Sequence, residues 1–266
     1  MPEVPVADSP RFETLLWRRD GPILTLTLNR PDRLNAFNAE MFRDLAQAVQ
    51  IISGQTDIGV VVLTGAGRAF CSGADLNNVS QYHSDAEGDS LAQGIRQAQK
   101  VFDAVEGIPQ PVIAAMNGHA VGAGLQVALA CDFRIAAHGT KLGLSDVKIG
   151  IVPALGATIR LPRLIGIAKT KELILTGDLI DADEAHRIGM VNQVVEKELL
   201  DQTVRELTEK LASRAPLAIA AAKRLLNESA PLEQVALAQS RLIKSADALE
   251  GISAFFQKRK PHFTGS

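Results

Sequence analysis

The stretch from residue 111 to residue 132 constrains the fold most strongly, because it reads as a strand, a turn and a helix in quick succession. The apolar run Val112–Met116 predicts a buried strand. Asn117-Gly118 is a pair typical of turns. Gly122-Ala123-Gly124 then leads into Leu125–Ala130, which is apolar almost all round and predicts a buried helix.

The turn before this predicted helix has a chemical consequence. The first N–H groups of a helix lack partners within it and carry partial positive charge, so they attract anions. Small residues such as Gly122 and Gly124 let a ligand approach that backbone closely. A single Gly-Ala-Gly run indicates tight packing of helix on strand. A second small-residue loop upstream, Gly65–Asp75, shifts the interpretation towards a ligand site.

Short strands alternate with helices over the first two-thirds of the chain, and the last third is helical, which predicts an α/β core with a helical tail. We expect a β-hairpin over residues 12–28, with its turn at Asp20-Gly21. Asn38 and Asp181 are expected to cap the helices that follow them. The other predicted strands are Ile58–Thr64, Phe133–Ala137 and Lys141–Leu144, and the other predicted helices are Met41–Ile52, Leu91–Val105, Leu200–Ala212, Pro216–Asn227 and Pro231–Phe256.

These patterns divide the chain into a flexible leader over residues 1–11, an α/β core over 12–199 and a helical region over 200–266. The segment between Leu76 and Ser90 is polar and has no clean period, which predicts a mobile segment. The last predicted helix is amphipathic and ends on Phe255-Phe256, which need a surface to cover them. That surface is either the core of the same chain or another subunit.

Composition excludes several classes of function. A net charge of −2 argues against binding of bulk nucleic acid, and no apolar run approaches the roughly 20 residues that span a bilayer. The N-terminus lacks the basic and apolar regions of a secretory signal, so we expect a cytoplasmic protein. We expect Cys71 and Cys131 to be buried free thiols. The Cys and His residues do not cluster at metal-ligand spacings, so we expect no metal site.

The order and spacing of many short motifs resemble the enoyl-CoA hydratase/isomerase family, the crotonase superfamily, from about residue 24 to residue 264. The motifs that carry the resemblance are Leu28-Asn-Arg-Pro31, Leu34-Asn-Ala36, Val61-Val-Leu-Thr-Gly65, Ala69-Phe-Cys-Ser-Gly-Ala-Asp-Leu76, Pro111-Val-Ile-Ala-Ala, Asn117-Gly118, Gly122-Ala-Gly124, Ala128-Leu-Ala-Cys-Asp132, Gly150-Ile-Val-Pro153, Arg160-Leu-Pro-Arg-Leu-Ile-Gly166, Thr176-Gly177, Glu184-Ala185, Gly189-Met-Val191 and Lys258-Arg-Lys260.

The resemblance implies a crotonase-like spiral of β-β-α units with a C-terminal helical region that forms trimers, often paired as a dimer of trimers. It implies an acyl-CoA thioester as the ligand, with no separate cofactor because coenzyme A is part of the substrate. By motif matching, the backbone N–H groups of Ala74 and Ala123 form the oxyanion hole that holds the thioester oxygen. Ala123 stands where many relatives have the middle Gly of a three-Gly run, and its N–H is retained.

The resemblance also implies residues that contact coenzyme A. Ser72, Ala74, Asp75 and Leu76 would line the adenine side, and Gly73 and Gly122 belong to the two loops of the hole. Arg33, Leu34 and Ala36 would follow the phosphates and pantetheine, while Lys260 and Phe263 would extend to the coenzyme A of a neighbouring subunit. His119 is either a donor near the thioester or a packing histidine.

The chain departs from the family at the two acidic positions of a hydratase, which match Gln126 and Asp146. A neutral amide exchanges no proton at working pH, although it can orient water or substrate. Asp is one methylene shorter than the usual Glu, yet it can act as a base if its loop lies close enough. One carboxylate suits a double-bond shift better than hydration. The alternatives are a hydratase with a modified acid pair, thioester hydrolysis, dehalogenation, or acyl-CoA binding without catalysis.

Overall fold

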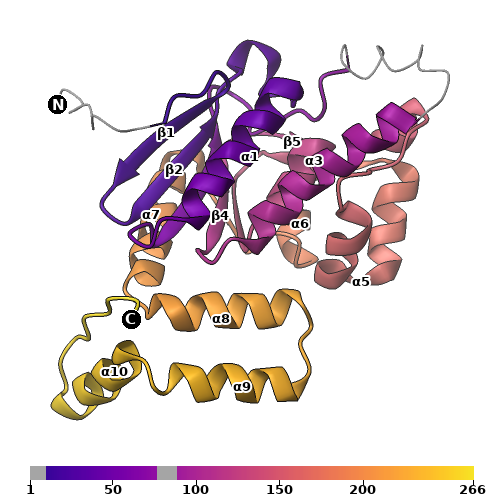
Figure 1. Ribbon diagram of the computed structural model, residues 1–266. Coiled ribbons are helices and arrows are strands. Elements are labelled where there is room, and N and C mark those ends of the chain that lie inside the picture. The colour runs from indigo at the N-terminus through magenta and orange to yellow at the C-terminus, as the bar shows by residue number, and fades with distance from the viewer. Residues whose placement is uncertain (1–9, 77–88) are drawn as a thin grey trace, which may run out of the picture.

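The computed structural model describes residues 10–76 and 89–266 (Figure 1). Most of the predicted leader, and most of the polar segment predicted between Leu76 and Ser90, therefore lie outside the described residues.

A six-stranded sheet forms the centre of the core, in the order β1-β2-β3-β4-β6-β9. Its strands are β1 (Leu15–Asp20), β2 (Ile23–Leu28), β3 (Val60–Gly65), β4 (Val112–Met116), β6 (Phe133–Ala137) and β9 (Gln193–Val195). β1 and β2 pair antiparallel as the predicted hairpin, and every other pair in this sheet is parallel. Parallel neighbours require crossover segments, and these segments carry the loops of the candidate site.

A second, three-stranded sheet lies beside those loops, in the order β5-β7-β8. β5 (Ala120–Val121) pairs parallel with β7 (Lys141–Gly143), which pairs antiparallel with β8 (Leu179–Asp181). The short β5 comes directly before α4 (Ala123–Leu129), so this sheet fixes the backbone at the entry of that helix.

Helices cover both faces of the large sheet. On one face lie α1 (Ala39–Ser53), α3 (Asp89–Gly107) and α4, whose apolar side chains join the main core cluster. On the other face, Leu200 and Val204 of α7 (Leu200–Ala212) pack against outward-facing residues of β3, β4 and β6. This alternation explains why β4 is apolar throughout: it is buried on both faces.

The remaining helices follow the sheets. They are η1 (Pro31–Arg33), η3 (Asp146–Ile149), α5 (Ala157–Thr176), α6 (Ala182–Arg187), η4 (Lys197–Leu199), α8 (Pro216–Asn227), α9 (Leu232–Leu242) and α10 (Ala246–Gln257). Figure 1 shows α8 and α9 side by side as a layer below the core, with α10 beyond them. Within the described ranges, no helix is both long enough and apolar enough to cross a membrane.

The prediction of one helix from Pro231 to Phe256 is wrong. The chain breaks at residues 243–245, where the Ser245 side chain accepts the Ala248 N–H and begins α10. A serine that caps a helix competes with continuation of the preceding one. The sequence analysis also missed α5, because Pro162 lies inside it and Gly166 interrupts it with a positive φ of 72°.

The predicted caps and thiols are confirmed. The Asn38 side chain accepts the Met41 N–H, and the Asp181 side chain accepts the Glu184 N–H. Cys71 and Cys131 are free and buried, and burial raises the pKa of each thiol to about 12. Both thiols therefore stay protonated and unreactive at neutral pH.

An ion pair between the buried Lys223 and the partly buried Asp132 fastens the helical region to the core. The Lys223 ammonium of α8 lies 2.7 Å from Asp132 Oδ2 and donates to the Gln110 carbonyl oxygen at 2.9 Å. Asp132 Oδ2 also accepts the Val112 N–H at the start of β4. Beyond α8, the apolar residues of α9 and α10 are largely uncovered, with Leu232 85% exposed and Phe255 and Phe256 79% and 77% exposed.

Candidate active site

Two loops from separate crossovers meet at the candidate site. The Cys71 N–H donates to the His119 carbonyl at 3.1 Å, and the Val121 N–H donates to the Cys71 carbonyl at 3.0 Å. These bonds bring the loop that contains Gly73 against the entry of α4. A side chain on Gly73 would begin 3.9 Å from the Ala123 nitrogen. The two predicted oxyanion-hole loops are therefore neighbours in space.

The Ala74 N–H owes its direction to a one-residue bridge with Phe37. The Phe37 N–H donates to the Gly73 carbonyl, and the Asp75 N–H donates to the Phe37 carbonyl, each at 2.8 Å. In a trans peptide the carbonyl and the following N–H point in opposite directions. Since the Gly73 carbonyl faces Phe37, the Ala74 N–H faces the other way, and it has no acceptor among the described residues.

The Ala123 N–H is fixed in the same manner. The Gly122 carbonyl accepts the Gln126 N–H at 3.0 Å, so the N–H of that peptide points out of α4. Gly122 has a φ of 52° and a ψ of −121°, which strongly favour glycine. Its own N–H donates to the Gly143 carbonyl at 2.9 Å. The described part of the chain offers the Ala123 N–H no acceptor.

Asp146 lies at the start of η3, beside the entry of α4. Its carboxylate oxygens would lie 3.9 Å and 4.0 Å from a Cβ on Gly122. Oδ2 is buried and lacks a hydrogen-bond partner among the described residues. Burial raises the pKa of Asp146, and its own backbone N–H opposes that shift. A carboxyl with a raised pKa and an unpaired oxygen is suited to take up a proton.

Gln126 is buried, with 2% of its surface exposed. Its Oε1 accepts the Leu155 N–H at 2.7 Å and the Ala157 N–H at 3.4 Å, which connects α4 to the loop that precedes α5. The hydrogen bonds of the side-chain oxygen are therefore made to the backbone of residues 155–157. The Nε2 group has no acceptor in the described ranges.

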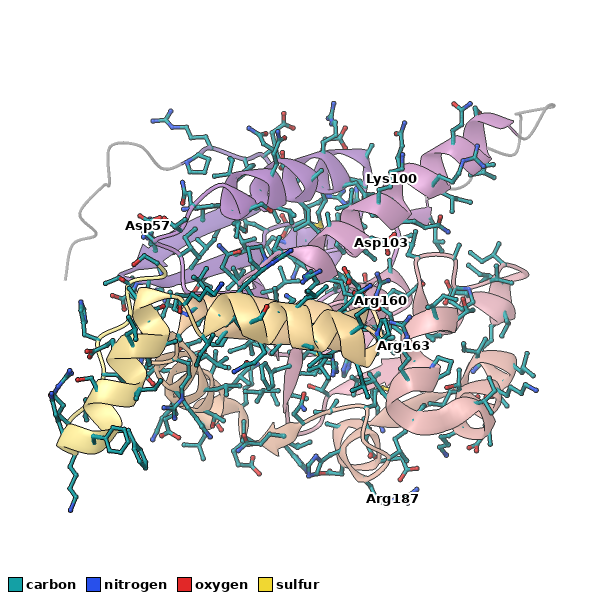
Figure 2. All side chains as sticks on the ribbon, turned by 60° about the horizontal axis from the view of Figure 1, so that its bottom comes forward. Asp57, Lys100, Asp103, Arg160, Arg163 and Arg187 are labelled. Atoms are coloured by element: carbon teal, nitrogen blue, oxygen red, sulfur yellow. The ribbon has the colours of Figure 1, made fainter. Side chains whose placement is uncertain are left out.

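The same loop is held from two further directions. Gln99 of α3 donates to the Ala154 carbonyl at 2.7 Å, and Arg160 donates to the Leu155 carbonyl at 3.2 Å. Arg160 is buried and also pairs with Glu106 at 2.7 Å and with Asp103 at 2.5 Å, across the gap between α5 and α3 (Figure 2). Sequence reasoning noted Arg160 only as part of a motif. A buried role depends on partners more than fifty positions away, so no local pattern points to it.

The residues predicted to follow coenzyme A lie around η1 and the Gly73 loop. Arg33, Ser72 and Leu76 are exposed, whereas Leu34 is half-buried and Ala36 is buried. The Asp75 carboxylate pairs with Arg30 at 3.1 Å, and Arg30 also donates to the Ala36 carbonyl at 2.5 Å.

From the sequence, Arg30 and Asn35 were noted only as members of motifs. Asn35 is fully buried, accepts the Arg30 N–H, and donates to the Ala66 and Ala69 carbonyls at 2.9 Å each. These two side chains tie η1 to the loop that follows β3.

Three predicted residues lie farther out. His119 is exposed, and its Nδ1 accepts the Lys141 N–H at 3.0 Å. Lys260 is exposed, and Phe263 lies against Gly251 of α10. Lys260 and Phe263 belong to the C-terminal segment, which Figure 1 separates widely from β5. Within one chain, the structure does not bring these two residues to the candidate hole.

A parallel-sheet core that brings two loops together, with a helical C-terminal region below it, defines an enzyme of the crotonase superfamily. The chain belongs to the enoyl-CoA hydratase/isomerase family, whose model matches residues 18–266. This confirms the resemblance and the fold class predicted from the sequence.

Individual relatives support the same family assignment. The chain is 36% identical over 259 residues to crotonyl-CoA hydratase of Syntrophomonas wolfei, which covers 95% of this chain and 98% of that protein. It is 39% identical over 260 residues to 1,2-epoxyphenylacetyl-CoA isomerase of Escherichia coli, which covers 96% and 99%. Among solved structures, an enoyl-CoA hydratase from Bacillus anthracis superposes with a TM-score of 0.90 at 36% identity, covering 96% of this chain and all of that one.

Proposed function

We propose that this enzyme acts on an acyl-CoA thioester, stabilises an enolate between the N–H groups of Ala74 and Ala123, and moves protons through Asp146. One observation carries the proposal: within the described residues, Asp146 has a buried oxygen without a partner, and it lies beside Gly122, which directly precedes the unpaired Ala123 N–H donor. A donor pair next to a base is what proton removal beside a thioester requires.

The two N–H groups act on the transition state. Proton removal from the carbon next to a thioester places negative charge on the thioester oxygen. Donors that the backbone already holds in place stabilise that charge more than they stabilise the neutral carbonyl. Loss of one such donor typically costs about 3 kcal/mol of transition-state stabilisation.

Asp146 is the proposed acid/base residue and Gln126 an orienting group. An amide cannot take up a proton at working pH, whereas a carboxylate can. One base that removes a proton and returns it to another carbon of the same substrate completes a double-bond shift. We therefore favour isomerisation. Hydration is the second candidate, because close relatives such as the Syntrophomonas wolfei protein are named hydratases.

The remaining predicted contacts complete the proposal. Coenzyme A lies along the loops that contain Arg33, Leu34, Ala36, Ser72 and Asp75. The exposed apolar residues of α9 and α10 are covered by other copies of the chain in a trimer or a dimer of trimers. In that assembly Lys260 and Phe263 reach the coenzyme A of a neighbouring subunit.

A panel of 2-enoyl-CoA and 3-enoyl-CoA substrates, followed by mass and absorbance, tests the reaction type. Isomerisation interconverts the two without a change in mass, whereas hydration adds the mass of water. Gln126→Glu supplies a second acid, so hydration of a 2-enoyl-CoA should rise relative to isomerisation. Fast hydration by the unaltered enzyme would overturn the preference for isomerisation. Binding of thioesters without turnover of any member of the panel would indicate a non-catalytic protein.

A further inference from the structure

The side-chain amide of Gln126 has a single orientation, and this determines which of its ends is free. Oε1 accepts two backbone N–H groups, from Leu155 and Ala157. If the amide were turned over, its NH₂ group would face two N–H donors, with which it cannot pair. The assignment of oxygen and nitrogen therefore follows from the partners. Nε2 is therefore the end of the amide that does not bond to the Leu155 and Ala157 N–H groups.

Nε2 is a donor that the chain leaves unused. Across residues 10–76 and 89–266, nothing accepts a hydrogen bond from it, although Gln126 is 2% exposed. Nε2 does not belong to the fully buried, unpartnered side-chain atoms of the described residues, so it keeps some accessible surface. A ligand that supplies an acceptor can therefore reach it and form a hydrogen bond.

The free donor lies close to the proposed reacting atoms. Gln126 follows Ala123 by three residues, which is about 4.5 Å along the helix at 1.5 Å per residue. Its backbone N–H donates to the Gly122 carbonyl, and the Asp146 carboxylate also lies beside Gly122. If the thioester oxygen binds the Ala123 N–H, the next two or three carbons of the acyl group fall within reach of Nε2.

We propose that Gln126 is a specificity-determining residue whose Nε2 donates to an acceptor oxygen on the acyl chain, at or near the third carbon. The enzyme then prefers acyl-CoA thioesters with a carbonyl, ether or epoxide oxygen at that position over plain hydrocarbon chains. This inference rests on the proposed thioester binding. A carboxylate in place of the Gln126 amide would place an acceptor opposite the acceptor oxygen of the substrate and would disfavour its binding. The neutral amide therefore selects for substrates with an oxygen at that position.

Gln126→Glu is a sharp probe, because it separates the two ends of the side chain. One carboxylate oxygen can still accept the N–H groups of Leu155 and Ala157, while the other replaces the donor by an acceptor. Gln126→Met removes the donor without adding charge. Gln47→Glu makes the same chemical change at an exposed position of α1 and serves as the matched control.

The measurement is the dissociation constant of 3-oxobutanoyl-CoA and of butanoyl-CoA, by isothermal titration calorimetry on the full-length protein. Neither ligand has a carbon–carbon double bond in its acyl chain that the enzyme could shift or hydrate. The unaltered enzyme and Gln47→Glu should bind the 3-oxo ligand about three- to tenfold more tightly, the scale of one neutral hydrogen bond. In Gln126→Met the ratio should fall to one or below, and in Gln126→Glu it should invert. Thermal unfolding verifies that each variant is folded.

The outcomes separate this inference from the proposed function. If both ligands bind the unaltered enzyme equally, or if Gln126→Glu and Gln126→Met keep the preference, the role of Gln126 is overturned while thioester binding stands. If neither ligand binds the unaltered enzyme, the proposed function fails and this inference fails with it.

Discussion

The Phe37 N–H donates to the Gly73 carbonyl at 2.8 Å, and this bond aims the N–H of the next residue, Ala74, away from Phe37. The direction of a proposed catalytic donor is thus set by a backbone contact with a residue that precedes the helix α1. The Gly122 carbonyl accepts the Gln126 N–H, and this bond in turn sets the direction of the Ala123 N–H.

Ala74→Pro should abolish turnover, because proline has no N–H to donate. The expected loss is on the order of 10²- to 10³-fold, the scale for one oxyanion-hole donor. Ala74→Gly retains the N–H and should keep most of the activity. The measurement is kcat/KM for both variants, with circular dichroism as a control for folding. Equal activity in the two folded variants would mean that Ala74 does not contact the thioester oxygen.

Asp146→Asn should lower turnover by roughly 10²- to 10⁴-fold, the range typical of a lost general base. Affinity for a saturated acyl-CoA should hardly change, since binding rests on other groups. Burial raises the pKa of Asp146, so the rate of the unaltered enzyme should fall on acidification at a higher pH than for an ordinary Asp. A variant with full turnover on every substrate would make His119 the next candidate.

The same substitution should make the protein more stable at neutral pH. A carboxyl whose pKa is higher in the folded state than in the unfolded state favours folding when protonated and opposes it when ionised. At pH 7 the substituted asparagine carries no charge to bury, so the Tm of Asp146→Asn should exceed that of the unaltered enzyme. The difference should shrink as the pH falls and Asp146 itself becomes protonated. A lower Tm for Asp146→Asn at pH 7 would contradict this.

Truncation after Ala230 should yield monomers or aggregates, because it removes the apolar faces of α9 and α10. Phe255→Ser together with Phe256→Ser is a milder version, since both rings are largely exposed and contribute little to packing within the chain. Light scattering gives the mass of each variant. A truncated protein that remains a trimer would remove the basis for oligomerisation through this region.

Lys223→Met should destabilise the fold by about 3 kcal/mol, because it leaves the largely buried Asp132 carboxylate, whose side chain is 19% exposed, without its cation. Arg224→Met is the control: its side chain is 54% exposed and lies 3.7 Å from Glu228, so its loss should cost about 0.5 kcal/mol or less. Urea midpoints at one protein concentration compare the two. Equal midpoints would show that Lys223 does not secure α8.

Elements bounded by strong local signals could be predicted from the sequence. β4, β6, α7 and α8 have the predicted bounds, since each is an apolar or amphipathic run between breakers. Two-residue and three-residue strands such as β5 and β9 carry too little pattern to be seen alone, because their pairing comes from tertiary context.

The residues of the candidate site could be proposed from the sequence, but the contacts between them could not. Motif matching named Gln126 and Asp146, yet nothing local indicates that the Gln126 oxygen binds backbone 29 and 31 residues away. The buried role of Arg160 was missed for the same reason. Contacts between distant segments depend on how the crossover segments pack, and this packing cannot be predicted from local patterns in a single sequence.

Gly124 is packed so closely on Cys71 that a methyl group there would lie 2.7 Å from the Cys71 Cβ. The two loops are thereby interlocked, and the donors they present belong to the main chain. A substitution that changes only a side chain leaves such main-chain donors in place. The proposed reaction is therefore altered more readily through the side chains at 126 and 146 than through the proposed donors.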